Sequence, residues 1–148
     1  MFCILPSTAK RVKENTSKKD NEKIKRETLN NISEYIAGGK NIDERLKQLD
    51  SEWDVERFLE ANAAIIVFIC TLLGIKRNKL WLAISLTVSI FLLEHALQGW
   101  CPPLPLLRKI GVRTEEEIFN EKTALKIHRG DFSAESSNPE ILLSLSEK

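Results

Sequence analysis

Two apolar runs joined by a short basic turn constrain this sequence more than any other feature. The first run extends from Ala61 to Ile75 and the second from Leu80 to Leu93, with the turn at residues 76–79. An α-helix rises about 1.5 Å per residue, so roughly 20 residues are needed to cross a hydrocarbon core about 30 Å thick. The two runs contain only 15 and 14 residues. Their length alone therefore does not separate membrane helices from the buried helices of a soluble protein.

The residues that flank the two runs favour a membrane. Arg57 and Lys76 bracket the first run 19 residues apart, and Trp81 and Trp100, near the start of the second run and beyond its end, have the same spacing. Nineteen residues of helix cover about 28 Å. Tryptophan, lysine and arginine side chains commonly anchor helices at the two membrane–water interfaces. The sequence therefore predicts an all-α fold built on a two-helix transmembrane hairpin at residues 57–100, flanked by amphipathic cytoplasmic helices.

Small side chains predict how the two helices would pack. Folding the chain about its turn places Thr71 level with Ser85. Small residues allow helix backbones to approach each other in lipid, where no hydrophobic force drives association. We therefore expect the seam between the helices to consist of two rows of small residues: Ala64, Val67, Thr71 and Gly74 on the first helix, and Ser85, Ser89, Ala96 and Gly99 on the second.

Polar side chains gather in one layer at the end of the hairpin nearer the two termini. Ionisable groups at membrane depth are costly and usually pair, so we expect Arg57 to pair with Glu60 or Glu94. One interpretation is a proton, ion or metal site. The other, which we favour because the layer lies only about 9 Å from Trp100, is an interfacial collar that fixes the depth of the helices. The layer consists of Arg57, Glu60, Asn62, Glu94, His95 and Gln98.

Outside the hairpin, the sequence predicts helices and flexible ends. Asn41 and Glu44 have the spacing of a helix-capping box, and the stripe Ile42, Leu46, Leu49 and Trp53 follows. This stripe is suited to packing on the C-terminal helix, on the membrane surface or on a second copy of the chain. The expected division is a flexible basic arm at 1–20, an amphipathic helical segment at 21–56, the hairpin at 57–100, a proline-rich turn and C-terminal helix at 101–132, and a disordered tail at 133–148.

The segment after Trp100 carries three prolines within four positions, Pro102, Pro103 and Pro105. Because proline cannot continue a helix, this pattern predicts an extended turn. Arg108 would then mark the return of the chain to water. A second capping box, Thr114 with Glu117, predicts the start of the C-terminal helix.

Charge predicts the sidedness of the hairpin. The turn carries three lysine and arginine residues, and the two flanks at 41–60 and 98–117 together carry six. Because positive residues are retained on the cytoplasmic side, we expect both termini in the cytoplasm, although the basic turn weakens this bias. The net charge of only +1 gives no argument for a nucleic-acid partner.

The chain contains no recognised catalytic, cofactor or metal motif, and its three cysteines form no CxxC pair. Cys70 is expected to fill space in the first helix, and His128 to lie on the surface. Cys101 has two interpretations. It is either a packing residue in a tight turn or a reactive thiol, with its thiolate stabilised by Arg108 or His95.

One segment resembles a known family. The stretch from Glu52 to Phe132 is similar to the bacterial YgaP-like transmembrane-domain proteins, chiefly through Gly99, Trp100, Cys101, Pro102 and Pro103, which follow the second helix as an interface turn. The resemblance implies a two-helix hairpin in the bacterial plasma (inner) membrane, and a homodimer. The namesake also carries a sulfur-transferring rhodanese domain, but the 50 N-terminal residues here are too short for one.

We therefore expect a small integral membrane protein that serves as an anchor or interaction module, with lipid, a second copy or a cytoplasmic protein as its partners. No enzymatic activity, cofactor or metal is expected. The alternative function is a redox or sulfur-handling membrane protein that uses Cys101.

Overall fold

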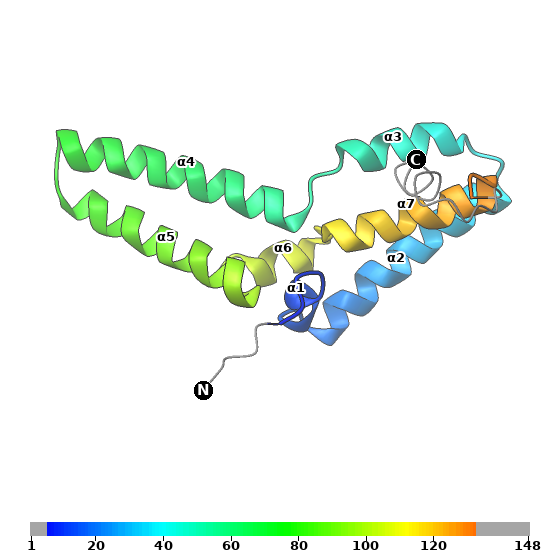
Figure 1. Cartoon of the computed structure of the whole chain (residues 1–148), viewed down its shortest axis with the longest axis horizontal. Helices are drawn as coiled ribbons and strands as arrows, with labels where there is room; N and C mark the ends of the chain where they lie inside the picture. Colours follow the sequence, from blue (N-terminus) through cyan, green and yellow to red (C-terminus); the bar gives the residue numbers. More distant parts are fainter. Residues whose placement is uncertain (1–5, 133–148) are drawn as a thin grey trace, which may run out of the picture. The chain divides into compact units, whose positions relative to one another are not determined.

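The computed structural model describes residues 6–132, and these residues form helices without any strand (Figure 1). The all-α prediction is therefore confirmed for this part of the chain. The helices are α1 (Arg11–Glu14), α2 (Lys18–Ala37), α3 (Ile42–Ser51), α4 (Val55–Lys76), α5 (Leu80–Gln98), α6 (Leu104–Ile110) and α7 (Glu115–Arg129).

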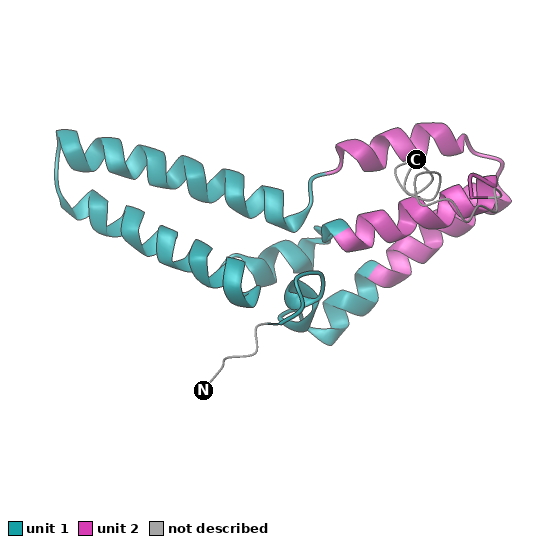
Figure 2. Cartoon of the chain, in the orientation of Figure 1, with its two compact units in different colours: residues 1–24, 53–115 teal, residues 25–52, 116–148 magenta. Residues whose placement is uncertain are grey.

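These helices form two compact units that do not follow the order of the sequence (Figure 2). The first unit comprises residues 1–24 and 53–115, and the second comprises residues 25–52 and 116–148. This division differs from the five consecutive segments expected from the sequence, because the N-terminal residues join the hairpin while α3 joins α7. The expected tail at 133–148 lies outside the described residues.

Helices α4 and α5 dominate the first unit. Asp54 caps α4, its carboxylate accepting a hydrogen bond of 2.6 Å from the backbone N–H of Arg57. Helix α5 ends at Gly99, whose φ of 78° is the left-handed conformation that glycine adopts without strain. Both helices are long enough and apolar enough to cross a membrane. Their bounds agree closely with the expected spans at 57–76 and 81–100.

The two helices run in opposite directions and pack along each other (Figure 1). Thr71 and Ser85 lie level, as the fold about the turn predicts, and their hydroxyl oxygens are 3.0 Å apart. A Cβ atom on Gly74 would lie 2.5 Å from Cδ2 of Leu82, so a larger residue there would have to displace the side chain of Leu82. Part of the expected seam is therefore correct.

The rest of the expected seam does not form. Ala64, Ser89 and Ala96 are exposed rather than packed between the helices. This end of the two helices lines a pocket instead of making a close contact.

The N-terminal arm, expected to be flexible, contributes to the core of the first unit. Val12 in α1 is only 1% exposed and packs in a buried cluster with Val55, Leu59, Cys101, Leu104 and Leu107. A Cβ atom on Gly99 would lie 2.6 Å from the backbone carbon of Arg11, so α1 lies directly against the end of α5. A single valine within a basic stretch carries no periodic pattern, which explains why the sequence did not reveal this packing.

The prediction of an extended turn for the proline-rich segment is also wrong. Pro102 and Pro103 form a turn, but the chain then enters the helix α6 instead of remaining extended. Pro105 is tolerated because it lies in the first turn, where a backbone N–H has no helical partner.

Arg108 does not mark the return to water, because its side chain is fully buried. Its guanidinium donates hydrogen bonds to the side-chain oxygens of Thr16 and Asn21, at 3.2 and 2.9 Å, and to the backbone carbonyl of Val112 at 2.9 Å. Arg108 thereby ties α6 to the segment that joins α1 to α2 and to the first turn of α2. Pairing with these oxygens offsets the cost of removing its charge from water.

The second unit has its own core, formed chiefly by α3 and α7. Asn41 caps α3 as predicted, its side-chain oxygen accepting hydrogen bonds from the backbone N–H groups of Asp43 and Glu44. The apolar stripe of α3 packs on the C-terminal helix, one of the three arrangements expected, and is therefore not free to dock a second copy. The buried residues are Leu46, Leu49, Ile118 and Leu125. Trp53, the last residue of the stripe, belongs to the first unit and is half-exposed.

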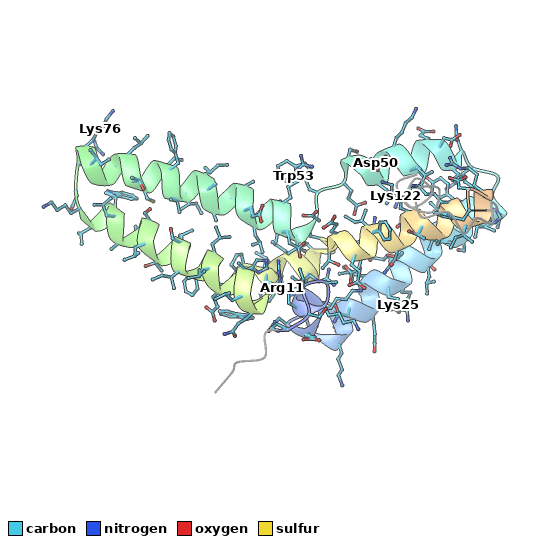
Figure 3. All side chains as sticks on the ribbon, viewed as in Figure 1. Arg11, Lys25, Asp50, Trp53, Lys76 and Lys122 are labelled. Atoms are coloured by element: carbon cyan, nitrogen blue, oxygen red, sulfur yellow. The ribbon has the colours of Figure 1, made fainter. Side chains whose placement is uncertain are left out.

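Ion pairs also join α3 to α7. Glu121 is fully buried, and Nε and a terminal guanidinium nitrogen of Arg45 each lie 2.8 Å from one of its carboxylate oxygens. A second, partly exposed pair joins Lys122 to Asp50 (Figure 3). The C-terminal end of α7 is fixed in the same way, by Arg129 and Asp43.

We expect Arg45→Ala to lower the free energy of unfolding of the second unit by about 3 kcal/mol, because it removes a cation from a carboxylate that has no contact with water. Lys122→Ala provides the matched control. It breaks a pair of the same two helices at the surface and should cost no more than about 1 kcal/mol. Amide hydrogen exchange in α3 and α7 measures both values, and equal losses would contradict the structural role of Arg45.

Candidate functional site

Arg57 does not form the ion pair expected of it. Its guanidinium carbon lies 5.0 Å from the ring centre of Trp53, in a cation–π contact, and within residues 6–132 no ion pair joins Arg57 to Glu60 or Glu94. Glu60 is exposed and Glu94 is half-buried. The prediction of an Arg57–carboxylate pair is therefore wrong. The ring of Trp53, which precedes the cap residue Asp54, binds the guanidinium of Arg57 in place of a carboxylate.

Two other members of the polar layer make hydrogen bonds to residues outside the layer. The side-chain amide of Asn62 donates to the carbonyl of Phe58 at 2.7 Å. The backbone carbonyl of Gln98 accepts a hydrogen bond of 2.7 Å from the side chain of Asn15. Asn62 and Gln98 are exposed. Both contacts lead away from the layer, and neither brings two of its polar side chains together as the ligands of an ion site would be.

His95 is the exception among these polar residues. Its side chain is only 4% exposed, and neither ring nitrogen has a hydrogen-bond partner. Leaving a buried polar atom without a partner costs about 1–3 kcal/mol. A partner supplied from outside the chain would recover this cost. His95 is therefore the residue in the layer that most directly indicates a ligand.

His95 also lines an apolar pocket of the first unit. The pocket has a volume of about 410 Å³ and is bounded by α4, α5 and the segment from Cys101 to Leu107. A volume of this size is within the usual range for small-molecule sites, about 300–1,000 Å³. Its only side chains with nitrogen or oxygen atoms are those of Asn62 and His95; the others are Phe58, Leu59, Ala63, Ile66, Val88, Phe91, Leu92, Cys101, Pro102, Pro103, Leu106 and Leu107.

The sequence did not reveal this pocket. After the turn at Pro102 and Pro103 the chain enters α6, and Leu106 and Leu107 of this helix line the pocket together with His95. The available signal was the change from a continuous apolar helix to a cluster of prolines and leucines. Because this cluster was predicted to form an extended turn, the pocket was not predicted.

The interface turn is well ordered by packing. Gly99 and Cys101 are buried, whereas Trp100, Pro102 and Pro103 remain exposed. Trp100 is 38% exposed and directly follows the Gly99 cap of α5.

Cys101 has the surroundings of a packing residue. It is 4% exposed and belongs to the buried cluster around Val12. Burial raises the pKa of its thiol, with a smaller opposing influence from the backbone N–H of Leu104. Arg108, the cation expected to stabilise its thiolate, instead hydrogen-bonds Thr16 and Asn21. A thiol with a raised pKa is a poor nucleophile at neutral pH, which argues against the redox interpretation.

The remaining candidate residues show no convergent chemistry. Cys70 is buried in α4 and His128 is exposed on α7, while Cys3 lies outside the described residues. No cluster of three or more His, Cys, Asp or Glu side chains that could hold a metal ion occurs among residues 6–132.

We expect slow alkylation of Cys101 by iodoacetamide in a chain that also carries Cys3→Ser and Cys70→Ser. Because the folded-state pKa lies above the free-thiol value of about 8.5, the rate should still increase between pH 8 and pH 9.5. It should approach the rate of a free thiol only after denaturation. A rate that is already constant below pH 8 would mean a stabilised thiolate and would restore the redox interpretation.

Comparison with known proteins does not assign the chain to a family. No family model matches the sequence, and neither a curated protein nor a solved structure shows significant similarity to it. The resemblance to the YgaP-like transmembrane-domain proteins therefore stays a prediction, and function must be argued from the chain itself.

Proposed function

We propose that the protein is a small integral membrane protein in which α4 and α5 cross the bilayer as a hairpin. The hairpin anchors the helical unit formed by α3 and α7 at the membrane. In this role the protein is a structural or interaction module and not an enzyme.

The observation that carries this proposal is the exposure of the apolar helices. Only 17% of the apolar window in α4 and 11% of that in α5 is buried inside the chain. A core helix of a soluble protein would be mostly buried. Fourteen large apolar side chains of these two helices are exposed: Ile65, Ile66, Phe68, Ile69, Leu72, Ile75, Leu80, Trp81, Leu82, Ile84, Leu86, Ile90, Leu93 and Leu97.

The ends of the two helices support the same proposal. Lys76, Arg77 and Lys79 occupy the turn, and Figure 3 shows Lys76 at that end of the hairpin. At the opposite end, Arg57 stacks on Trp53. Long basic side chains and tryptophan are suited to the headgroup layers, where apolar and polar surroundings meet.

The excess of lysine and arginine beside the two termini favours a cytoplasmic location for both ends. The YgaP-like resemblance, centred on Gly99, Cys101 and Pro102, adds a bacterial plasma membrane and a homodimer to this proposal. The stripe on α3 is not the dimer surface, because Leu46 and Leu49 are already covered by α7.

The test is membrane extraction of the full chain expressed in bacteria. Wild-type protein should remain in the membrane pellet after an alkaline carbonate wash and should be released only by detergent. Ile69→Lys combined with Leu86→Lys should shift most of the protein out of the pellet, because each lysine near the middle of a span costs about 3 kcal/mol on insertion.

Ile127→Lys is the matched control. Ile127 is 62% exposed on α7, as large an exposed apolar residue as those of the hairpin, but it lies outside the proposed spans. This variant should remain in the pellet like the wild type. Release of wild-type protein by carbonate alone, or equal behaviour of the two lysine variants, would contradict the proposal.

A further inference from the structure

The apolar pocket beside His95 has the features of a site for part of a lipid molecule. Its walls come from α4, α5 and the segment from Cys101 to Leu107, all within one compact unit. The walls are almost entirely hydrocarbon. Because Asn62 already donates to the carbonyl of Phe58, His95 is the one lining side chain with unused hydrogen-bonding nitrogens.

The position of His95 along α5 restricts what its partner can be. His95 precedes Trp100 by five residues, or about 7.5 Å of helix rise. Val88, which also lines the pocket, lies about 10 Å deeper along the same helix. The pocket therefore starts close to the interface and continues toward the middle of the hairpin. A ligand that follows it has one polar group near the interface and an apolar chain below it.

We propose that this pocket holds one acyl chain of a membrane phospholipid, with the imidazole of His95 hydrogen-bonded to the ester carbonyl of that chain. Both nitrogens of His95 are covered by protein in the present arrangement. In the lipid-bound state we expect the ring to rotate about its Cβ–Cγ bond, so that one N–H faces the pocket that the residue already lines. The proposal rests on the membrane insertion proposed above.

An uncharged carbonyl at the head of an apolar chain fits this site better than a charged group. The lining contains no lysine, arginine, aspartate or glutamate that would neutralise a buried charge. A phospholipid supplies the required combination at the required depth, since its ester carbonyls lie where the headgroups meet the hydrocarbon. The surrounding bilayer also supplies it at high concentration.

The experiment uses the full chain reconstituted in phosphatidylcholine vesicles. The vesicles contain a trace of phosphatidylcholine with a photoactivatable diazirine in one acyl chain, linked through either an ester or an ether. We expect crosslinks on Phe91 and Leu92, which line the pocket and are only partly exposed, formed about fivefold more with the ester than with the ether lipid. A single hydrogen bond of ordinary strength accounts for this ratio.

Variants separate the pocket from the general lipid surface. Ala63→Trp fills the pocket and should remove most crosslinks to Phe91, whereas Ile69→Trp, at an exposed position that does not line the pocket, should leave them unchanged. His95→Leu should bring the ester-to-ether ratio close to one. His95→Gln, which keeps an N–H donor, should restore part of the preference and so shows that the loss is not caused by unfolding.

The outcomes also separate this proposal from the proposed function. Equal labelling of Phe68 and the pocket residues, unaffected by Ala63→Trp, means ordinary lipid contact and overturns the pocket proposal alone. Displacement of the label by added ubiquinone means that a diffusible quinone is the occupant and overturns the assignment to phospholipid. An absence of labelling even at the exposed Phe68 overturns membrane insertion together with the pocket.

Discussion

The apolar surface of α4 and α5 that the chain leaves uncovered is the constraint on which the rest of the structure depends. Burying a large apolar side chain is worth about 1.5–3 kcal/mol, and fourteen such side chains on these helices are exposed. Even at half exposure, their contact with water costs on the order of 10 kcal/mol. A cost of that size equals the whole stability of a typical domain. Lipid removes this cost without any further protein.

The first unit is organised at the end of the hairpin where both helices leave the apolar region. Val12, Leu104 and Leu107 form a protein core there, because neither helix alone could bury Val55 and Leu59. Arg108 joins the segments through buried hydrogen bonds and has no contact with solvent. The pocket beside His95 lies at this same end of the hairpin, between α4, α5 and the segment from Cys101 to Leu107.

The sequence predicted the long, periodic elements and missed the contacts made by isolated residues. Lengths and flanking charges located α4 and α5 within a few residues, and Asn41 located the start of α3. The burial of Arg108, however, could not be predicted from the residues around it in the sequence. It depends on hydrogen bonds to Thr16 and Asn21, which are far away along the chain. The candidate site was predicted only in part, again because it depends on contacts between residues far apart in the sequence. His95 was named, but its pocket also needs Leu106 and Leu107, which line it only because the chain enters α6 after the turn at Pro102 and Pro103.

The most direct test of lipid as the environment of α4 and α5 is the accessibility of a spin label at position 68. The label is attached to Phe68→Cys in a cysteine-free chain reconstituted in vesicles, with Ile127→Cys for comparison. The account predicts that dissolved oxygen relaxes the label at position 68 more strongly than a water-soluble nickel chelate, and that the order reverses at position 127. Equal exposure of both positions to the nickel chelate would contradict it, because α4 would then face water.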